Sequence, residues 1–279
     1  LRLNIDAIDD EIHSLLLRRT DLVTQIGNLK RASNREGFSL RPSREATIIR
    51  RLVAHHSGPF PVTALVRLWR ELLSGQVMVQ NDFNIALFDP STEATYRHIT
   101  RDQFSASGRV HLLPSPTQVI HAVASGNSAV GVLPLPSDKH PDPWWATLPD
   151  GGDIPLRIIA RLPFLKEKRD AAAQSEALVV ARVTPEPSGE DVSLVVVGLS
   201  EHTGDKELEK LLRAQNLVAT TLSRSTNHDH LGHSLYFLAI EGFVQQDALP
   251  ITNFLRSAAK VVTQVTVVGS YAKQLYIDN

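Results

Sequence analysis

Three cations near the start of the chain, Arg2, Arg19 and Lys30, have types and spacings that could bind an anion. Apolar residues recur at heptad seam positions from Ile5 to Leu29, which predicts a long amphipathic helix over 1–33. Position 19 belongs to that seam, yet it holds an arginine. Because a guanidinium keeps its proton, burying it without an anion is strongly unfavourable. Arg19 therefore either extends into solvent or meets a negative ligand inside a helical bundle.

The spacing along this helix decides which cations can share a ligand. Lys30 lies about three turns after Arg19 and roughly 16 Å along the axis, so two long side chains can converge on one small anion. Arg2 is about 25 Å from Arg19 and about 42 Å from Lys30 on the same helix. If Arg2 is functional, it serves a site that another subunit completes, which predicts a homodimer.

Composition excludes several classes of protein. The 279 residues suit two or three domains, and 29 Lys+Arg against 30 Asp+Glu give no electrostatic case for a nucleic-acid partner. The absence of cysteine excludes thiol catalysis and thiolate metal sites. No apolar run reaches the roughly 18 residues of a membrane helix, and the charged N-terminal helix lacks a secretory signal pattern. We therefore expect a cytoplasmic protein without a membrane partner.

The chain divides into a helical part and two α/β parts. Two further helices are expected after the first, over 44–56 with Ser43 as N-cap and over 62–81. In the latter an apolar stripe turns polar, since Leu65, Leu68 and Leu72 are followed by Gln76 and Gln80. The predicted fold class is multidomain: an all-α N-terminal part over 1–81, an α/β part over 82–184 and a ferredoxin-like α+β part over 190–279.

Strand and helix patterns support the two α/β parts. A βαβαβ unit is expected over 83–135, followed by a loop over 136–153 and short apolar runs at 154–164 and 176–184. The order βαββαβ follows, with strands at 193–199, 218–223, 235–241 and 265–269 and helices at 205–215 and 247–260.

Polar residues that interrupt the apolar pattern of the helical part are the candidate site. They are Arg19, Lys30, Arg44, Glu45, Gln76 and Gln80, with Arg2 from a second subunit. Several arginines in a helical pocket suit a small polyanionic acid. No serine–histidine pair, cysteine or metal-ligand cluster accompanies them, so the expected chemistry needs no nucleophile, metal or cofactor. A unimolecular rearrangement fits, although each cation taken alone is also explained as an ordinary surface charge.

These same residues carry a resemblance to a known family. The segments Arg18-Arg19, Ile26-Gly27, Lys30, Arg41-Pro42-Ser43-Arg44-Glu45, Arg70-Glu71 and Gln80 resemble the all-helical (AroQ-type) chorismate mutase over 1–81. The resemblance implies conversion of chorismate, a dicarboxylate, to prephenate in aromatic amino-acid biosynthesis, part of the shikimate pathway. Gln76 and Arg41 depart from the family, which often has a small residue and an acid at those places.

The resemblance also implies a role for each site residue. Lys30 and Gln80 would donate to the ether oxygen as the carbon–oxygen bond breaks, and Glu45 would accept from the substrate hydroxyl. Arg19 and Arg44 would be active-site cations, and Gln76 would contact substrate. Arg2 would reach a carboxylate across the dimer interface. A neutral Gln80 donates at every pH, whereas a glutamate there would have to be protonated.

The rest of the chain resembles the bifunctional chorismate mutase–prephenate dehydratase. The strand ending Val132-Leu133-Pro134 is similar to the first lobe of a prephenate dehydratase, and the C-terminal part is similar to an ACT domain. However, Leu135-Pro136-Ser137, Asp89-Pro90-Ser91-Thr92 and Ser175-Glu176-Ala177-Leu178 replace three of the dehydratase's motifs. We therefore expect no dehydratase activity. The ACT-like part also lacks the family's ligand motifs, which leaves binding of an aromatic amino-acid effector open, whereas a dimerising role does not depend on those motifs.

Two remaining clusters have ordinary explanations. His228, His230 and His233 fit a solvated polar loop better than a metal site, and Trp144-Trp145 fits packing or an interface better than a ligand site. Two alternatives to a monofunctional mutase stay open. One is a bifunctional mutase–dehydratase, and the other is a non-catalytic amino-acid sensor built on an inactive mutase.

Overall fold

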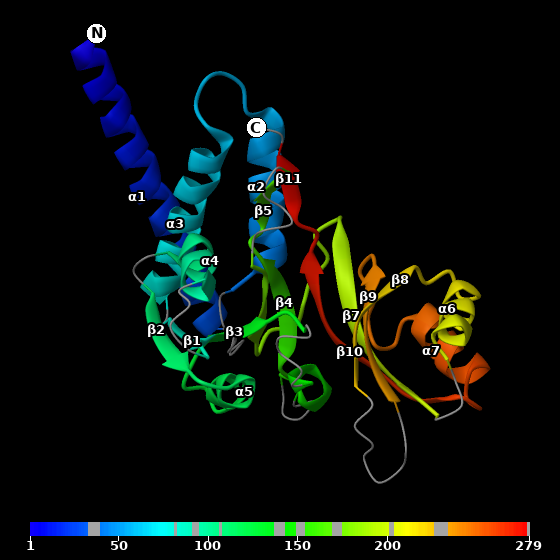
Figure 1. Ribbon diagram of the computed structural model, residues 1–279. Coiled ribbons are helices and arrows are strands. Elements are labelled where there is room, and N and C mark those ends of the chain that lie inside the picture. Colours follow the sequence, from blue (N-terminus) through cyan, green and yellow to red (C-terminus); the bar gives the residue numbers. More distant parts are fainter. Residues whose placement is uncertain are drawn as a thin grey trace.

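The computed structural model shows a helical N-terminal region beside a large sheet (Figure 1). It describes residues 1–32, 40–80, 83–90, 95–105, 108–136, 143–148, 154–168, 175–200, 204–225 and 234–277. The helices of the N-terminal region are α1 (Arg2–Ala32), α2 (Pro42–His55) and α3 (Val62–Gln80). The three helices expected from periodicity are thus present, with boundaries within two residues of those predicted.

The start of α2 corrects one prediction. We expected Ser43 to cap a helix over 44–56, but α2 begins at Pro42, with Arg41 at the N-cap position. Proline favours the first helical position because its φ is already helical and its missing N–H is not needed there. The Ser43 hydroxyl instead donates to the carbonyl oxygen of Glu186, which ties α2 to the sheet-rich region.

The helix α1 extends away from the rest of the molecule towards the N-terminus (Figure 1). The seam residues predicted for it are each more than half exposed in this single subunit: Ile5, Ile8, Ile12, Leu15, Leu22, Ile26 and Leu29. A row of exposed aliphatic side chains this long is unusual for a soluble surface and is typical of a helix that packs against another chain.

The buried face of α3 differs from the predicted stripe. Val66, Leu73 and Val77 are buried, whereas Leu68 is 51% exposed. The physical reason is that α3 packs on α4 (Thr95–Phe104) and the sheet-rich region with a face that the leucine stripe does not share. Arg70 lies on this buried face, and so does the predicted site residue Gln76.

The predicted βαβαβ unit is confirmed. Its strands β1 (Asn84–Phe88), β2 (Arg109–Leu113) and β3 (Val130–Pro134) are parallel in the order β2-β1-β3, with α4 and α5 (Pro116–Ala124) as crossovers. The apolar runs that follow form β4 (Arg157–Leu162), β5 (Leu165–Glu167) and β6 (Ala177–Ala181), and β6 pairs antiparallel with both β3 and β4. Buried valines and leucines on both faces explain why these short runs read as continuous apolar segments.

The predicted βαββαβ order is also present. It comprises β7 (Asp191–Leu199), α6 (Asp205–Arg213), β8 (Ala219–Ser225), β9 (Ser234–Glu241), α7 (Leu249–Ser257) and β10 (Val262–Ala272). Its antiparallel strand order is β10-β7-β9-β8, with α6 and α7 on the right of Figure 1. That order of elements and strands is ferredoxin-like.

The two α/β parts share a single sheet. Among the described residues, nine strands run in the order β2-β1-β3-β6-β4-β10-β7-β9-β8. The junction is a short parallel contact in which Gly269 of β10 pairs with Ile158 of β4. A Cβ atom at position 269 would lie 2.1 Å from the Ile158 carbonyl oxygen, so only glycine allows this approach. A smaller sheet pairs β5 with β11 (Leu275–Ile277).

Helix α2 is anchored to the C-terminal part of the chain. The Arg50 guanidinium donates to the carbonyl oxygens of Glu190 and Lys273 at 2.9 and 2.8 Å, and to the Ser188 hydroxyl at 3.1 Å. A shared apolar cluster lies beside these bonds and contains Ala46, Ile49, Val66, Phe164 and Ala272. The helical region and the sheet therefore form one packed body.

The two tryptophans belong to the core. Trp144 and Trp145 lie in the short 3₁₀ helix η1 (Trp144–Thr147), each 1% exposed. The Trp145 ring stacks on Phe237 of β9 at 5.1 Å between centroids. Packing, one of the two explanations favoured from sequence, is thus confirmed. The three histidines at 228, 230 and 233 lie outside the described residues.

Candidate active site

A small cavity lies where the three N-terminal helices meet. Its volume is about 120 Å³. Each helix contributes residues at helical spacing, which places them on one face. We call it the arginine cavity; its lining is Arg19 and Val23 from α1, Arg41, Arg44, Glu45 and Ile48 from α2, and Leu73, Gln76 and Val77 from α3. Four residues predicted as site residues, Arg19, Arg44, Glu45 and Gln76, are therefore brought together.

Arg19 is placed where the seam argument expects an anion. Its Nη1 atom is buried and has no hydrogen-bond partner within the part of the chain that the structure describes. Burial and the nearby charge of Arg44 lower the pKa of Arg19. The guanidinium nevertheless keeps its proton, and one of its nitrogens is held where water does not reach it. An anion in the cavity would relieve both the desolvation and the repulsion from Arg44.

Gln76 presents a second donor without a partner. Its side chain is buried in α3, and its Nε2 atom makes no hydrogen bond to any described residue. Buried donors are nearly always satisfied in folded proteins, so such exceptions point to a missing ligand or water. Two unsatisfied donors in a cavity lined by three arginines are complementary to an anion that also accepts a neutral hydrogen bond.

Glu45 is the acid among the described residues that line this cavity, and it is paired. The Arg70 Nη1 atom donates to its Oε2 atom at 2.9 Å, with both side chains largely buried. Burial raises the pKa of the Glu45 carboxyl, and the Arg70 guanidinium opposes that shift. The sequence did not predict that Arg70 pairs with Glu45. One signal was available: Arg70 lies three residues before the cavity-lining Leu73, which places both on one face of α3.

The other predicted site residues are not among the described residues that line the arginine cavity. Arg2 lies on the exposed end of α1, far from Arg19 along the same helix. Helices α1 and α3 include Lys30 and Gln80, but these two side chains lie outside the described part of the structure. Arg41, which the sequence marked only as a departure from the family, lines the cavity one turn before Arg44.

A second hollow continues from the same arginines. It has a volume of about 260 Å³ and shares Arg19, Arg44 and Ile48 with the arginine cavity. Its other lining residues are Thr47, Arg51 and Trp69. The two spaces together are large enough for a small dicarboxylic acid, and the described residues that line the second hollow include no acid.

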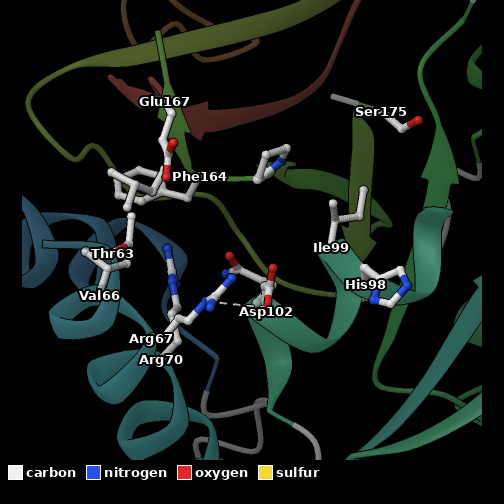
Figure 2. A pocket seen from close by; sticks show the side chains of 13 residues that line it. Thr63, Val66, Arg67, Arg70, His98, Ile99, Asp102, Phe164, Glu167 and Ser175 are labelled. Atoms are coloured by element: carbon white, nitrogen blue, oxygen red, sulfur yellow. Dashed lines mark ion pairs between the residues drawn. The ribbon is translucent and has the colours of Figure 1, made fainter. Parts of the chain in front are cut away.

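A larger cavity of about 640 Å³ lies on the other side of Arg70 (Figure 2). Its walls come from α3, α4 and the segment that joins β4 to β5, including Arg67, Asp102 and Phe164. Arg67 and Asp102 form an ion pair at 3.9 Å, and both are mostly exposed. Size alone would favour this cavity, but its charges are balanced, and it holds none of the buried unpaired donors that mark the arginine cavity.

Metal and membrane features were also sought. Within the described ranges, no group of three or more histidine, aspartate and glutamate side chains is placed to hold a metal ion. None of the described helices combines the length and apolarity that spanning a membrane requires.

Comparison with known proteins then links the helical region to a family. Residues 1–81 match the family described as chorismate mutase type II. The match covers the three helices that build the arginine cavity. The chorismate mutase domain is therefore at the N-terminus, as the resemblance of the motifs implied.

The relatives are bifunctional enzymes. A bifunctional chorismate mutase/prephenate dehydratase of Aquifex aeolicus is 30% identical over 141 residues, and one of Stutzerimonas stutzeri is 25% identical over 142 residues. Each match covers 48% of this chain and 38% of the relative. The matched part of the chain thus spans well under half the length of those relatives.

Solved structures resemble the chain in fold. A prephenate dehydratase from Arthrobacter aurescens in complex with L-Phe matches 68% of this chain and 90% of its own, with a TM-score of 0.50 and 14% identity. GqqA, described as a novel type of quorum quenching acylase, matches 68% of this chain and 95% of its own, with a TM-score of 0.51 and 16% identity. The helical N-terminal region is therefore followed by a sheet-rich α/β region whose fold is similar to that of a prephenate dehydratase.

Proposed function

We propose that this protein is a chorismate mutase that rearranges chorismate to prephenate in the arginine cavity, without a cofactor. The reaction breaks one carbon–oxygen bond and forms one carbon–carbon bond within a single molecule. It therefore needs a held substrate conformation and donors at the oxygen where negative charge develops. The family match over residues 1–81 and the donors that meet there both support this assignment.

One observation carries the proposal. The buried Nη1 atom of Arg19 and the buried Nε2 atom of Gln76 have no partners among the described residues, and they line a cavity that also contains Arg41 and Arg44. A dicarboxylate satisfies the arginines in bidentate fashion, and a hydroxyl or ether oxygen suits the neutral amide. Glu45 would accept from the substrate hydroxyl, and Lys30 and Gln80 would donate to the ether oxygen.

We infer that the working unit is a homodimer. The exposed seam of α1 offers a second copy of the same helix an aliphatic surface to pack against. Arg2, about 25 Å along α1 from Arg19, would then contribute to the partner's site and bind a substrate carboxylate there. The arginine cavity would be completed by the partner's helix.

For the rest of the chain we propose a supporting role without dehydratase activity. Glu176, which stands where the dehydratase motif is expected, is engaged by Arg161, Lys166 and Gln274. The ferredoxin-like part would be an ACT-like domain that dimerises or takes an aromatic amino acid. Because the relatives are described as bifunctional, a mutase that also dehydrates prephenate is the second candidate.

Product identification tests these proposals together. The full chain is incubated with chorismate at neutral pH, and products are separated without acid treatment. We expect prephenate to accumulate as the sole product. Appearance of phenylpyruvate would establish the bifunctional alternative, and unchanged chorismate would leave the non-catalytic sensor as the explanation.

A further inference from the structure

One aromatic side chain of the sheet-rich region lies between two arginines of the helical region. Phe164, in the turn between β4 and β5, has the Arg50 guanidinium 5.8 Å and the Arg70 guanidinium 5.0 Å from its ring centroid. Phe164 is 7% exposed, and Arg70 is 5% exposed. Figure 2 shows Phe164 and Arg70 on the same cavity, carried by different parts of the chain.

Arg70 connects this contact with the arginine cavity. Its guanidinium faces Phe164 and also donates to the Glu45 carboxylate at 2.9 Å. A planar guanidinium can stack with its face and donate with its edge at the same time. Phe164, Arg70 and Glu45 thus form a continuous chain of contacts from the β4–β5 turn to the cavity lining.

We propose that Arg70 is a positioning residue for Glu45, and that Phe164 of the sheet-rich region fixes the orientation of Arg70. The inference rests on the function proposed above, in which Glu45 accepts a hydrogen bond from the substrate. It gives the sheet-rich region a role in the mutase reaction, because that region supplies the aromatic ring that packs against Arg70.

The groups around Glu45 determine how the loss of Arg70 would change the pKa of the Glu45 carboxyl. The described charged residues that line the same cavity are Arg19 from α1 and Arg41 and Arg44 from α2. Behind Arg70 lie the Phe164 ring and the neutral Gln103, and the charged or titratable residues on that side are Arg67 of α3, His98 and Asp102 of α4, Arg161 of β4 and Glu167 of β5. Burial raises the pKa of Glu45 and Arg70 counteracts it. Removing Arg70 would therefore raise the pKa of Glu45 further and favour its neutral form.

Three variants separate positioning from general packing. Arg70→Gln removes the charge, Arg70→Lys keeps the charge but removes the planar fork, and Phe164→Leu keeps an apolar side chain but removes the aromatic face. Arg67→Gln is the matched control, since Arg67 lies one turn earlier on α3, lines the same large cavity and is mostly exposed. Urea unfolding of each full-length variant identifies any that do not fold.

We expect Arg70→Gln to lower kcat by up to about 100-fold with a smaller change in KM, because a misplaced group acts mainly on the transition state. The acid limb of its pH profile should move towards neutral pH. Arg70→Lys should restore the position of that limb but not the full rate. Phe164→Leu should lower kcat about 3- to 10-fold, as expected for loss of a cation–π contact. Arg67→Gln should match the wild type.

The outcomes distinguish this inference from the proposed function. If wild-type protein turns over chorismate and folded Arg70→Gln and Phe164→Leu keep its rate and pH profile, the positioning role is wrong. If wild-type protein does not turn over chorismate, the proposed function fails. The role of Arg70 is then decided by carbon-13 NMR titration of glutamate-labelled protein, with the Glu45 signal assigned from Glu45→Gln. A Glu45 pKa raised in Arg70→Gln supports positioning, and an unchanged pKa overturns it.

Discussion

At the scale of single residues, the proposed function depends on buried charged and donor groups that could bind a ligand. Arg19 occupies a seam position of α1 where an aliphatic residue would pack, and its Nη1 atom is buried without a described partner. Arg19 as a whole is half-buried, and a negative ligand for it inside the bundle stays a prediction. A buried guanidinium nitrogen beside Arg44 is unfavourable by itself, and the proposed substrate anion would offset that cost.

Gln80 gives a prediction about pH. The proposed role requires a donor to the ether oxygen, and an amide donates at every pH. Gln80→Glu should therefore be nearly inactive at neutral pH and regain activity as the pH falls and the carboxyl becomes protonated. Steady-state rates from pH 4 to 8 check this, with wild-type protein measured in parallel. Equal activity of the variant at neutral pH would remove Gln80 from the site.

Glu176 gives a prediction about stability. Burial alone would raise the pKa of its carboxyl, but hydrogen bonds from Arg161, Lys166 and Gln274 outweigh this and lower the pKa below its ordinary value of 4.5. The network should therefore stabilise the fold above about pH 4.5 and lose that contribution as the pH falls through the lower folded-state pKa. Glu176→Gln should lower the free energy of unfolding by about 3 kcal/mol at pH 7, because it leaves two largely buried cations unpaired.

Urea unfolding at pH 7 and at pH 4 measures this effect. The variant should show a weaker dependence on pH than the wild type. Glu209→Gln is the control, since Glu209 pairs with Arg213 on the exposed face of α6 and should contribute less than about 1 kcal/mol. Equal effects of the two substitutions would contradict the stabilising role of the Glu176 network.

Sequence reasoning predicted part of the lining of the arginine cavity. Arg19, Arg44, Glu45 and Gln76 converge because helical spacing places residues three and four apart on one face. The partner of Glu45 could not be predicted, since pairing between Arg70 and Glu45 depends on how α2 and α3 cross. The catalytic roles assigned by resemblance stay predictions.

At the scale of elements, the exposed seam of α1 predicts the oligomeric state. Ile8 and Ile12 lie one turn apart on that seam and are each more than half exposed. The double variant Ile8→Asp with Ile12→Asp should be monomeric and lose most mutase activity, because carboxylates cannot be buried between two helices. Sedimentation velocity measures the mass. Asp10→Asn on the same helix is the control and should stay dimeric; a double variant that is still dimeric would place the interface elsewhere.

The junction between β4 and β10 gives a second prediction. Gly269→Ala would bring a methyl group within 2.1 Å of the Ile158 carbonyl oxygen, so the strands must move apart. We expect a loss of at least about 1–3 kcal/mol, as for other overpacked sites. Gly75→Ala is the control, because an added methyl group there meets open space in α3 and alanine favours helix by about 1 kcal/mol. Thermal unfolding compares the two, and similar midpoints would contradict the close contact.

The order of helices and strands was largely predictable from the sequence, whereas the joining of the two α/β parts into one sheet was not. Alternating strand and helix patterns predicted β1 to β3 and β7 to β10 with small errors at the ends, since each pattern is local. The pairing of Gly269 with Ile158 joins strands more than 100 residues apart in sequence. No local pattern encodes such a contact, so the sequence divided the chain at 184–190 where the structure has a continuous sheet. Whether those limits are also domain boundaries stays a prediction.

At the scale of the whole molecule, the helical region and the sheet form one body. Arg50 donates hydrogen bonds to Ser188, Glu190 and Lys273. Phe164 packs against Arg50 and Arg70. These contacts join the sheet-rich region to the helices that line the arginine cavity. The Phe164 variants test whether this packing matters for activity.

The most direct test of the central claim is the ratio of kcat/KM for chorismate between wild-type protein and Arg19→Ala, with Arg18→Ala as the exposed neighbouring control. We predict that wild-type protein and Arg18→Ala form prephenate at similar rates. Arg19→Ala should be about 10²- to 10³-fold slower, the loss typical of one electrostatic donor in an active site. Turnover that survives in folded Arg19→Ala, or no turnover by wild-type protein, would contradict the claim that the arginine cavity is a chorismate mutase active site.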